Sequence, residues 1–284
     1  EFITELDSLF SANLDNAWNL ALDLDNDVAY VVTFNSDSIT SIDVSDPSNL
    51  VELDSFSNAK LNRASGVALD LRNRVAYVVS ALSDTITSIS ISNPNNLTEL
   101  DSYNSSFLNN VNGIALDLDN DVAYVVAGSR ITSIDISNPS NLSLLDSYQN
   151  SSSFTTAYDI ELDLVNEVAY LVSRSQDSIT SIDIRSPSNL RELDSLSSAN
   201  LDGPREVALD LTNQIAYVVS SVAGSITSID ISDPSNLTEL DSLSNSNLNL
   251  AQELVLDLTN QVAYVAAGIS DSITSIDISD PSNL

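Results

Sequence analysis

A ten-residue segment recurs six times along the chain, and this repeat constrains the fold more than any other feature. Ala21-Leu-Asp-Leu-Asp-Asn-Asp-Val-Ala-Tyr30 returns, with substitutions, at intervals of 47, 47, 46, 47 and 47 residues. The copies begin near residues 21, 68, 115, 161, 208 and 255. Each is followed by an Ile-Thr-Ser-Ile run and a proline-containing turn. A fixed period of this length is typical of propellers, solenoids and other repeat folds.

Each copy has the pattern of four short strands. In the fifth copy we expect strands over residues 206–211, 215–220, 225–232 and 237–243, separated by turns rich in Asn, Ser, Gly and Pro. The second of these strands is apolar throughout, which predicts burial on both faces. Four strands per copy and six copies predict an all-β, six-bladed β-propeller with four antiparallel strands per blade. We expect residues 1–284 to form a single domain.

The two ends of the chain favour a ring over a linear solenoid. The chain ends at Asp280-Pro-Ser-Asn-Leu284, where a third strand has just finished. The missing fourth strand resembles Thr238–Leu243 of the preceding copy, and the N-terminus repeats it as Thr4-Glu-Leu-Asp-Ser-Leu9. We therefore expect residues 1–10 to supply the outer strand of the last blade and to close the ring, which removes exposed sheet edges.

Composition excludes several classes of function. The chain has 41 acidic and 9 basic residues, a formal charge of −32, and neither Cys nor His. The absence of these two residue types excludes disulfides, thiolate metal sites and a Ser-His-Asp triad. The negative charge predicts no nucleic-acid partner. No stretch reaches the roughly 20 apolar residues of a membrane span. We expect no cofactor, with calcium as the alternative.

Three motifs resemble those of the LVIVD-repeat propellers of bacteria and archaea. They are Ala29-Tyr30-Val31, the strand and turn Ser41-Ile-Asp-Val-Ser-Asp-Pro47, and Asp101-Ser102-Tyr103. The resemblance covers essentially the whole chain. It implies a six- or seven-bladed propeller in a secreted or surface-attached protein, so we expect an extracellular or cell-surface location.

Two residue types recur in all six copies, and a structural role explains both. The recurrent aspartates are expected to accept backbone N–H groups of the following hairpin turn. The recurrent tyrosines are expected to pack between blades, each hydroxyl with one partner. The aspartates are Asp23, Asp70, Asp117, Asp163, Asp210 and Asp257. The tyrosines are Tyr30, Tyr77, Tyr124, Tyr170, Tyr217 and Tyr264.

Two further motifs indicate ligands or modification less specifically. Two acidic turns resemble calcium loops but lack the glycine and the bidentate glutamate of such loops. Their acids are Asp23, Asp25, Asp27, Asp117, Asp119 and Asp121. Glycosylation acceptors of the Asn-x-Ser/Thr type occur at Asn96, Asn104, Asn141, Asn150 and Asn236. They matter only if the protein is exported by a cell with that machinery.

The copies differ most just before the first strand, where we expect the chain to enter the mouth of the central channel. Loops of all blades converge there, so this variation predicts a ligand-binding mouth; ordinary loop diversity is the alternative. Aromatic rings there could stack on a sugar, and the arginine could pair a carboxylate. The candidate residues are Trp18, Asn19, Tyr158, Asp159, Arg205, Glu206 and Glu253.

These observations predict a non-enzymatic propeller that serves as an adhesion or interaction scaffold for a protein or carbohydrate ligand. It would be a monomeric ring or part of a larger surface protein. One alternative is a propeller hydrolase or lyase in which Asp159, Glu206 and Glu253 hold a divalent cation in the channel. Another is a structural subunit of a surface filament or array, formed by exchange of the N-terminal strand.

Overall fold

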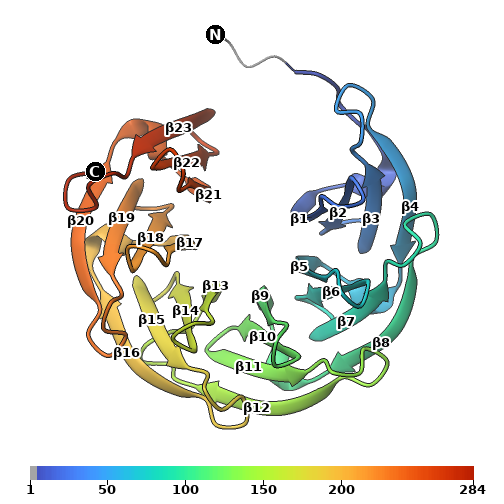
Figure 1. The fold of residues 1–284 in the computed structure, drawn as a ribbon, viewed down its shortest axis with the longest axis horizontal. Helices are drawn as coiled ribbons and strands as arrows, with labels where there is room; N and C mark the ends of the chain where they lie inside the picture. The colour runs from blue at the N-terminus through green and yellow to red at the C-terminus, as the bar shows by residue number, and fades with distance from the viewer. Residues whose placement is uncertain (1–4) are drawn as a thin grey trace. The chain divides into compact units, whose positions relative to one another are not determined.

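The computed structural model describes residues 5–284, which form 23 β-strands in six sheets (Figure 1). The predicted fold class, an all-β six-bladed propeller with antiparallel blades, is confirmed. The chain divides into two compact units. Unit 1 comprises Glu1–Val125 and Thr132–Leu145; unit 2 comprises Val126–Ile131 and Asp146–Leu284. Each unit is described by itself, and the expected single domain stays a prediction.

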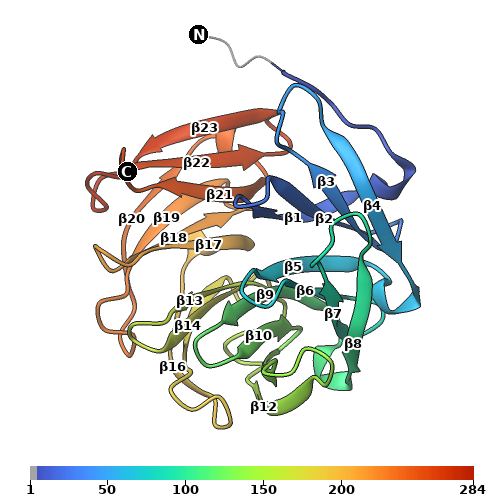
Figure 2. The same cartoon turned by 45° about the vertical axis from the view of Figure 1, so that its right-hand side comes forward.

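Unit 1 contains the first two sheets and most of the third. In each sheet the strands lie side by side in sequence order, the first strand at one edge and the fourth at the other (Figure 2). The strands of the first three sheets are β1 (Ala17–Asp23), β2 (Val28–Thr33), β3 (Ser38–Asp43), β4 (Val51–Ser57), β5 (Ala64–Asp70), β6 (Val75–Ser80), β7 (Thr85–Ser90), β8 (Thr98–Asn104), β9 (Val111–Asp117), β10 (Val122–Ala127), β11 (Arg130–Asp135) and β12 (Ser143–Gln149).

Unit 2 contains the last three sheets, the final one with three strands among the described residues. Their strands are β13 (Ala157–Asp163), β14 (Val168–Ser173), β15 (Ser178–Asp183), β16 (Arg191–Ser197), β17 (Pro204–Asp210), β18 (Ile215–Ser220), β19 (Ser225–Asp230), β20 (Thr238–Ser244), β21 (Ala251–Asp257), β22 (Val262–Ala267) and β23 (Ser272–Asp277).

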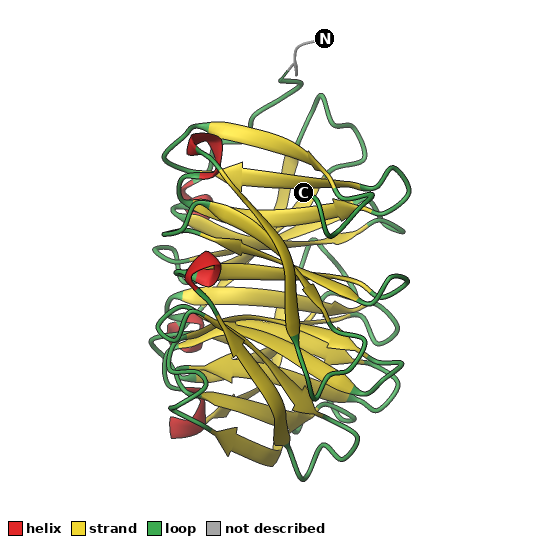
Figure 3. Ribbon diagram, turned by 90° about the vertical axis from the view of Figure 1, so that its left-hand side faces the viewer, coloured by secondary structure: helices red, strands yellow, loops and turns green. Residues whose placement is uncertain are grey.

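Helical structure in residues 5–284 is limited to short 3-10 turns between sheets (Figure 3). A Ser or Asn cap begins each one; Ser198, for example, accepts the N–H of Asn200 at 3.2 Å. No helix among the described residues is long and apolar enough to cross a membrane. The turns are η1 (Ala12–Leu14), η2 (Ala59–Leu61), η3 (Ser106–Leu108), η4 (Ala199–Leu201) and η5 (Ser246–Leu248).

The recurrent aspartate closes the first hairpin turn of every sheet, as predicted. In the fifth sheet Asp210 Oδ1 accepts the N–H groups of Thr212 and Asn213, both at 3.1 Å. Its Oδ2 accepts the Asn213 side-chain amide at 2.7 Å. The turn then passes through Gln214 in the left-handed region, at φ 57°. Equivalent bonds occur at Asp23, Asp70, Asp117, Asp163 and Asp257.

The second strand of the first five sheets is buried at every residue, whereas β22 of the last sheet is buried in part and its Tyr264 is 43% exposed. Every residue of β18 is buried, so both faces of this strand pack against neighbouring strands and sheets. The recurrent tyrosine lies here, and its hydroxyl reaches the next sheet. Tyr217 Oη donates to the carbonyl of Ile278 at 3.4 Å. Tyr77 and Tyr170 make the same contact with Ile136 and Ile231. The predicted packing role is thus confirmed for these three.

Polar side chains also bind each sheet to the next one. On the third strand, Ser228 Oγ donates to the carbonyl of Pro281 at 2.6 Å. On the fourth strand, Asp194 Oδ2 accepts the Leu237 N–H at 2.7 Å. The serine bond recurs from Ser41, Ser88 and Ser181. The aspartate bond recurs from Asp7, Asp54, Asp101, Asp146 and Asp241.

The N-terminal segment contacts the first sheet in the way that the fourth strand of one sheet contacts the next sheet along the chain. Asp7 Oδ2 accepts the Leu50 N–H at 2.7 Å, and Leu9 packs against the buried Ala29 and Ile42. Residues 5–10 are not in a strand, and residues 1–4, with the predicted Thr4, lie outside the described residues. Closure of the last blade by this segment therefore stays a prediction.

Replacing Asp194 by alanine should destabilise the fold by about 1–3 kcal/mol, because it leaves a buried N–H without an acceptor. That N–H belongs to Leu237, which is only 4% exposed. Urea denaturation measures the loss. Asp194→Asn keeps an acceptor oxygen and should lower the free energy of unfolding by less than half as much. An equal loss of stability in both variants would show that the contact requires the negative charge.

Two cysteines placed at Ser8 and Thr274 should form a disulfide within one chain. Thr227 Oγ1 and Ser242 Oγ lie 3.0 Å apart, and the repeat makes Thr274 and Ser8 their counterparts. The natural chain has no Cys to compete. Non-reducing electrophoresis detects the bond, and Ser48→Cys with Thr274→Cys is the control that should stay reduced. A covalent dimer would show that the segment pairs with a second copy instead.

Candidate functional site

The variable residue pairs before each first strand turn out to be β-bulges. In the fourth sheet Ala157 pairs with Ser173 and Asp159 pairs with Val172, so Tyr158 is the extra residue. The register shifts in the same way at the start of β1, β5, β17 and β21. A bulge changes the direction of side chains and disrupts the ladder locally. The bulge therefore explains why these positions accept different residue types and why their side chains point away from the regular ladder.

The second residue of a bulge binds the first strand of the next sheet. Asp159 Oδ2 accepts the N–H of Val207 at 3.0 Å, and Glu206 Oε2 accepts that of Leu254 at 2.8 Å. In unit 1 the amide oxygen of Asn19 accepts the Val67 N–H at 3.3 Å. These side chains therefore have a structural role, which a neutral amide also fulfils.

Unit 2 brings five of the predicted residues together on neighbouring strands. Arg205 Nη1 donates to Tyr158 Oη at 2.5 Å, and the guanidinium carbon lies 4.7 Å from the centre of the Tyr158 ring. Arg205 also interacts electrostatically with Glu253. The Arg205 Nε is one of three buried side-chain atoms in residues 5–284 without a hydrogen-bond partner. We call Tyr158, Asp159, Arg205, Glu206 and Glu253 the bulge cluster.

Burial raises the pKa of the three acids in this cluster, and repulsion by neighbouring acids adds to the shift of Asp159 and Glu206. Burial raises the pKa of Asp159 to about 6, against the opposing effect of the N–H groups of Val207 and Ile160. Burial, together with the charges of Asp159 and Glu253, raises the pKa of Glu206 strongly. Burial also raises the pKa of Glu253, although its hydrogen bond with Glu206 and the charge of Arg205 oppose the shift. The side chains of Glu206 and Glu253 therefore lie within hydrogen-bonding reach of each other.

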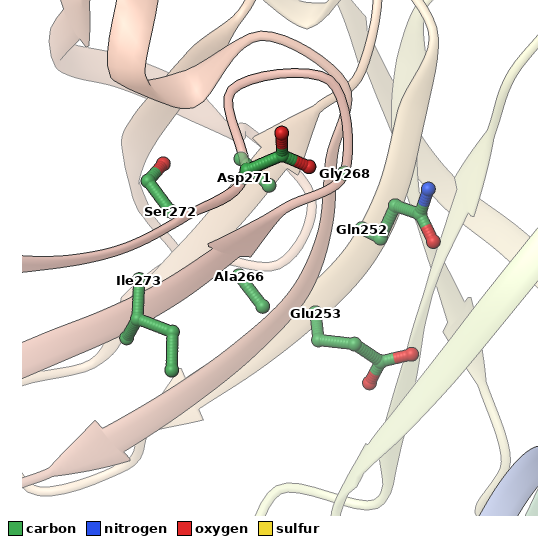
Figure 4. Close-up of a pocket in the computed structure, with 8 residues that line it drawn as sticks. Gln252, Glu253, Ala266, Gly268, Asp271, Ser272 and Ile273 are labelled. Atoms are coloured by element: carbon green, nitrogen blue, oxygen red, sulfur yellow. The ribbon is translucent and has the colours of Figure 1, made fainter. Parts of the chain in front are cut away.

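A pocket of about 320 Å³ adjoins the cluster at Glu253 (Figure 4). Gln252 and Glu253 lie side by side on β21, and Asp271 and Ser272 come from the loop and strand start after β22. Its volume is at the lower end of the range for small-molecule sites. Sequence reasoning missed Asp271 and Ser272, because no motif marks them. The lining residues are Gln252, Glu253, Ala266, Ala267, Gly268, Asp271, Ser272 and Ile273.

Trp18 and Asn19, the other predicted mouth residues, belong to unit 1. The Trp18 ring is 41% exposed and meets Phe34 edge-on at a centroid distance of 4.2 Å. The guanidinium carbon of Arg63 lies over the Phe34 ring, 4.7 Å from the ring centre. Trp18 therefore belongs to an aromatic group with Phe34, whereas Asn19 binds the Val67 N–H.

The candidate calcium loops serve as hairpin turns. Asp23 and Asp117 bind the amides of Asn26 and Asn120 in their own turns. Asp27 and Asp121 adopt φ 54° at the turn ends. No group of three or more acidic side chains in residues 5–284 is arranged to hold a metal ion. Calcium binding by these aspartates, including Asp25 and Asp119, stays untested.

Four of the five glycosylation acceptors are exposed: Asn96, Asn104, Asn141 and Asn236. Asn150 is half-buried, and its amide donates to Glu192 Oε2 at 2.7 Å. The exposure of these four residues leaves room for a glycan, and their glycosylation stays a prediction.

Comparison with known families identifies the chain. The model of the seven-bladed β-propeller lactonases matches residues 35–284. The chain belongs to this lactonase family. Here the described residues form six sheets, one fewer than the family description states. No match was found among curated proteins.

Solved structures with the same fold include several bacterial proteins. A Lactobacillus plantarum protein is 16% identical, with a TM-score of 0.79 over 91% of this chain and 80% of that chain. A Bacteroides uniformis protein, provisionally assigned as a 6-phosphogluconolactonase, is 10% identical, with a TM-score of 0.80 over 94% and 82%. The periplasmic gluconolactonase of Pseudomonas aeruginosa is 11% identical, with a TM-score of 0.67 over 92% and 73%. At these identities the likeness shows the fold.

Membership of the lactonase family corrects the predictions that followed from the LVIVD resemblance. The assignment to LVIVD-repeat propellers was wrong, since Ala-Tyr-Val and Asp-Pro motifs reflect strand and turn chemistry common to propellers. The secreted adhesion scaffold was also wrong, because the matching family is that of the lactonases. The filament alternative has no support in these comparisons. Cellular location as such stays a prediction.

Replacing Asp159 by asparagine should stabilise the protein at pH 8 and have little effect at pH 4. Folding raises the pKa of Asp159 to about 6, so the stability that this group contributes is present at low pH and is lost as pH rises through about 6. Asparagine keeps the acceptor for Val207 without the buried charge, as Asn19 does for Val67. We expect a Tm gain of about 2–4 °C at pH 8.

Thermal unfolding at both pH values measures the gain from Asp159→Asn. Asp233→Asn, in an exposed turn, is the control and should change the Tm little at either pH. A destabilised Asp159→Asn at pH 8 would show that the carboxylate charge itself stabilises the fold.

Proposed function

We propose that this protein hydrolyses a lactone in the pocket beside Glu253, with the bulge cluster as its acid–base machinery. The observation that supports this most is the hydrogen-bonding contact between the Glu206 and Glu253 side chains at the edge of a pocket. Membership of the lactonase family indicates the reaction class. The chain contains no His, so a carboxylate is the base most compatible with its composition.

Ring opening requires a base for water and an acid for the leaving oxygen. The Glu253 carboxylate lines the pocket and takes a proton from water as the water oxygen attacks the lactone carbonyl carbon. The ring C–O bond then breaks, and the carboxylic acid of Glu206 gives its proton to the leaving alkoxide. Water and lactone become one hydroxy acid, with no other reactant.

The hydrogen bond between the two glutamates restores the starting state. After one turnover Glu253 holds the proton and Glu206 has lost it, and transfer along their shared bond reverses this. The raised pKa of Glu206 keeps it protonated near neutral pH, as a general acid requires. Backbone support from Leu254 holds Glu206 in position.

The charge of Arg205, which is not among the residues that line the pocket, acts on Glu253. Gln252 is the group best suited to stabilise the tetrahedral oxyanion, because it offers a side-chain amide to the pocket. Removing one such donor typically lowers kcat by about 10²–10³-fold. Tyr158 fixes the Arg205 guanidinium by its hydrogen bond and ring contact.

Glu253→Gln should lower kcat for a δ-lactone by at least about 100-fold, because glutamine cannot accept the proton of water. Indicator-coupled acid release from glucono-δ-lactone between pH 5 and 7.5 measures the rate. In the unmodified protein kcat should rise with pH as Glu253 loses its proton, and it should fall at higher pH as Glu206 loses its proton. Glu167→Gln, in an exposed turn of the same unit, is the control and should match the unmodified protein. Unchanged kcat in Glu253→Gln with a normal melting curve would contradict this mechanism.

A further inference from the structure

We propose that Trp18, Phe34 and Arg63 form a second binding site, which takes a small carboxylate with hydroxyl groups, such as a sugar acid. All three residues belong to unit 1, whereas the bulge cluster belongs to unit 2. Hydrolysis of a lactone yields a hydroxy acid, so the choice of ligand class rests in part on the proposed function. The contacts that form the site do not depend on that reaction.

Three separate segments of the chain bring these side chains together. Trp18 is the extra residue of the bulge in β1, Phe34 directly follows β2, and Arg63 directly precedes β5. The ring centres of Trp18 and Phe34 lie 4.2 Å apart, and the Arg63 guanidinium carbon lies 4.7 Å from the centre of the Phe34 ring. Phe34 therefore contacts both of the other side chains and sets their separation.

Backbone hydrogen bonds fix two of these segments. The Phe34 N–H donates to the carbonyl of Asn16 at 3.0 Å, and the Arg63 N–H donates to Asp37 Oδ1 at 2.9 Å. Arg63 adopts the left-handed conformation there, at φ 59°. Because the backbone that carries the ring and the guanidinium is already ordered, a ligand has less conformational entropy to remove.

The repeat does not require any of the three side chains. At the positions of Trp18, Phe34 and Arg63, other copies carry Ser65, Ala81 and Asn110 respectively. These copies form the same type of sheet with small or neutral residues at these places. A structural role common to the copies therefore does not account for the group, and a ligand is the more direct explanation.

The charge of Arg63 is not neutralised by a neighbouring acid. Basic side chains that pair with a carboxylate include Lys60, Arg72, Arg74, Arg185 and Arg191. Within residues 5–284 the exposed Arg63 guanidinium has no such pair and lies on the Phe34 ring instead. Arginine binds a carboxylate with two parallel N–H···O bonds. The net charge of −32 disfavours a dianion such as phosphate more than a single carboxylate.

Trp18 provides a surface for the rest of the ligand. Its ring is 41% exposed and combines an apolar face with one polar N–H group. The face can pack against the C–H groups of a sugar chain, and the indole N–H, which is a donor only, fits a hydroxyl oxygen. A carboxylate on Arg63 and hydroxylated carbons on Trp18 together describe a sugar acid.

Tryptophan fluorescence tests the site directly, because Trp18 is the only Trp in the chain. Gluconate is the probe, and sorbitol and acetate are the comparators, since each has only one of its two parts. At constant ionic strength we expect a saturable change in emission with gluconate and at least about tenfold weaker binding of each comparator. No saturable change with gluconate would overturn the proposal. Equal binding of acetate or of inorganic phosphate would show a plain anion site and contradict the ligand class.

Substitutions taken from the other copies test the role of each side chain by calorimetry. Arg63→Asn should weaken gluconate binding at least about tenfold, because it removes the charged donors. Asn110 shows that asparagine tolerates the left-handed backbone at this position, at φ 58°. Trp18→Ser and Phe34→Ala should weaken binding as well. Arg174→Asn removes an exposed arginine from unit 2 and is the control that should bind gluconate normally. Unchanged binding in Arg63→Asn, with a normal melting curve, would contradict the proposal.

Binding and turnover together separate this proposal from the proposed function. Gluconate binding at Trp18 without hydrolysis of glucono-δ-lactone would support the second site and contradict the catalytic assignment. Hydrolysis of the lactone without any response of Trp18 to gluconate would support the catalytic assignment and contradict the second site.

Discussion

The fold depends on hydrogen bonds between polar side chains of one sheet and backbone groups of the next. Ser228 is fully buried, and so is Thr227 beside it. Buried hydroxyls destabilise a protein unless they find partners. In this chain the partner of Ser228 is the Pro281 carbonyl on the neighbouring sheet, and the Asp241 carboxylate accepts the Leu284 N–H there. Ser228 also bonds the Asp241 backbone in its own sheet, at 3.1 and 3.2 Å, so the neighbouring sheet adds the shorter 2.6 Å bond to Pro281 and the bond of the Leu284 N–H.

The candidate site uses the same principle and adds charge to it. Glu206 binds the Leu254 N–H in the next sheet, as Asn19 binds Val67 in unit 1. Because a neutral amide fulfils this structural role, the fold does not require acids at Asp159 and Glu206. Their burial near one another makes the charged forms costly at neutral pH. The proposed role of Glu206 in proton transfer gives a physical reason for that cost.

The repeat was sufficient to predict the fold, because period, alternation and turn residues all indicate one architecture. The capping role of Asp210 and the packing of Tyr217 also followed from residue type and position. The bulge at Tyr158 did not, since one extra residue leaves no mark in a pattern of apolar alternation. The candidate site was predicted in part: its five bulge residues were found from variation among the copies.

The pocket and the function were harder to predict. Asp271 and Ser272 join Glu253 only through the pairing of β21 with β22 and of β22 with β23. The adhesion role was inferred from the closed repeat, the acidic Cys-free composition and the absence of a catalytic motif, and none of these excludes chemistry by carboxylates. Chemistry at the bulges distinguishes members of such a fold, and a handful of side chains there is too few to determine a family from one sequence.

The contacts between sheets bear on how such a chain changes its length during evolution. Each aspartate and serine contact joins a sheet only to the next one, and several copies contribute the same donors and acceptors. A duplicated or deleted copy would therefore meet neighbours that already present the matching groups. Whole repeats can thus be added or lost without the need for new kinds of contact between sheets.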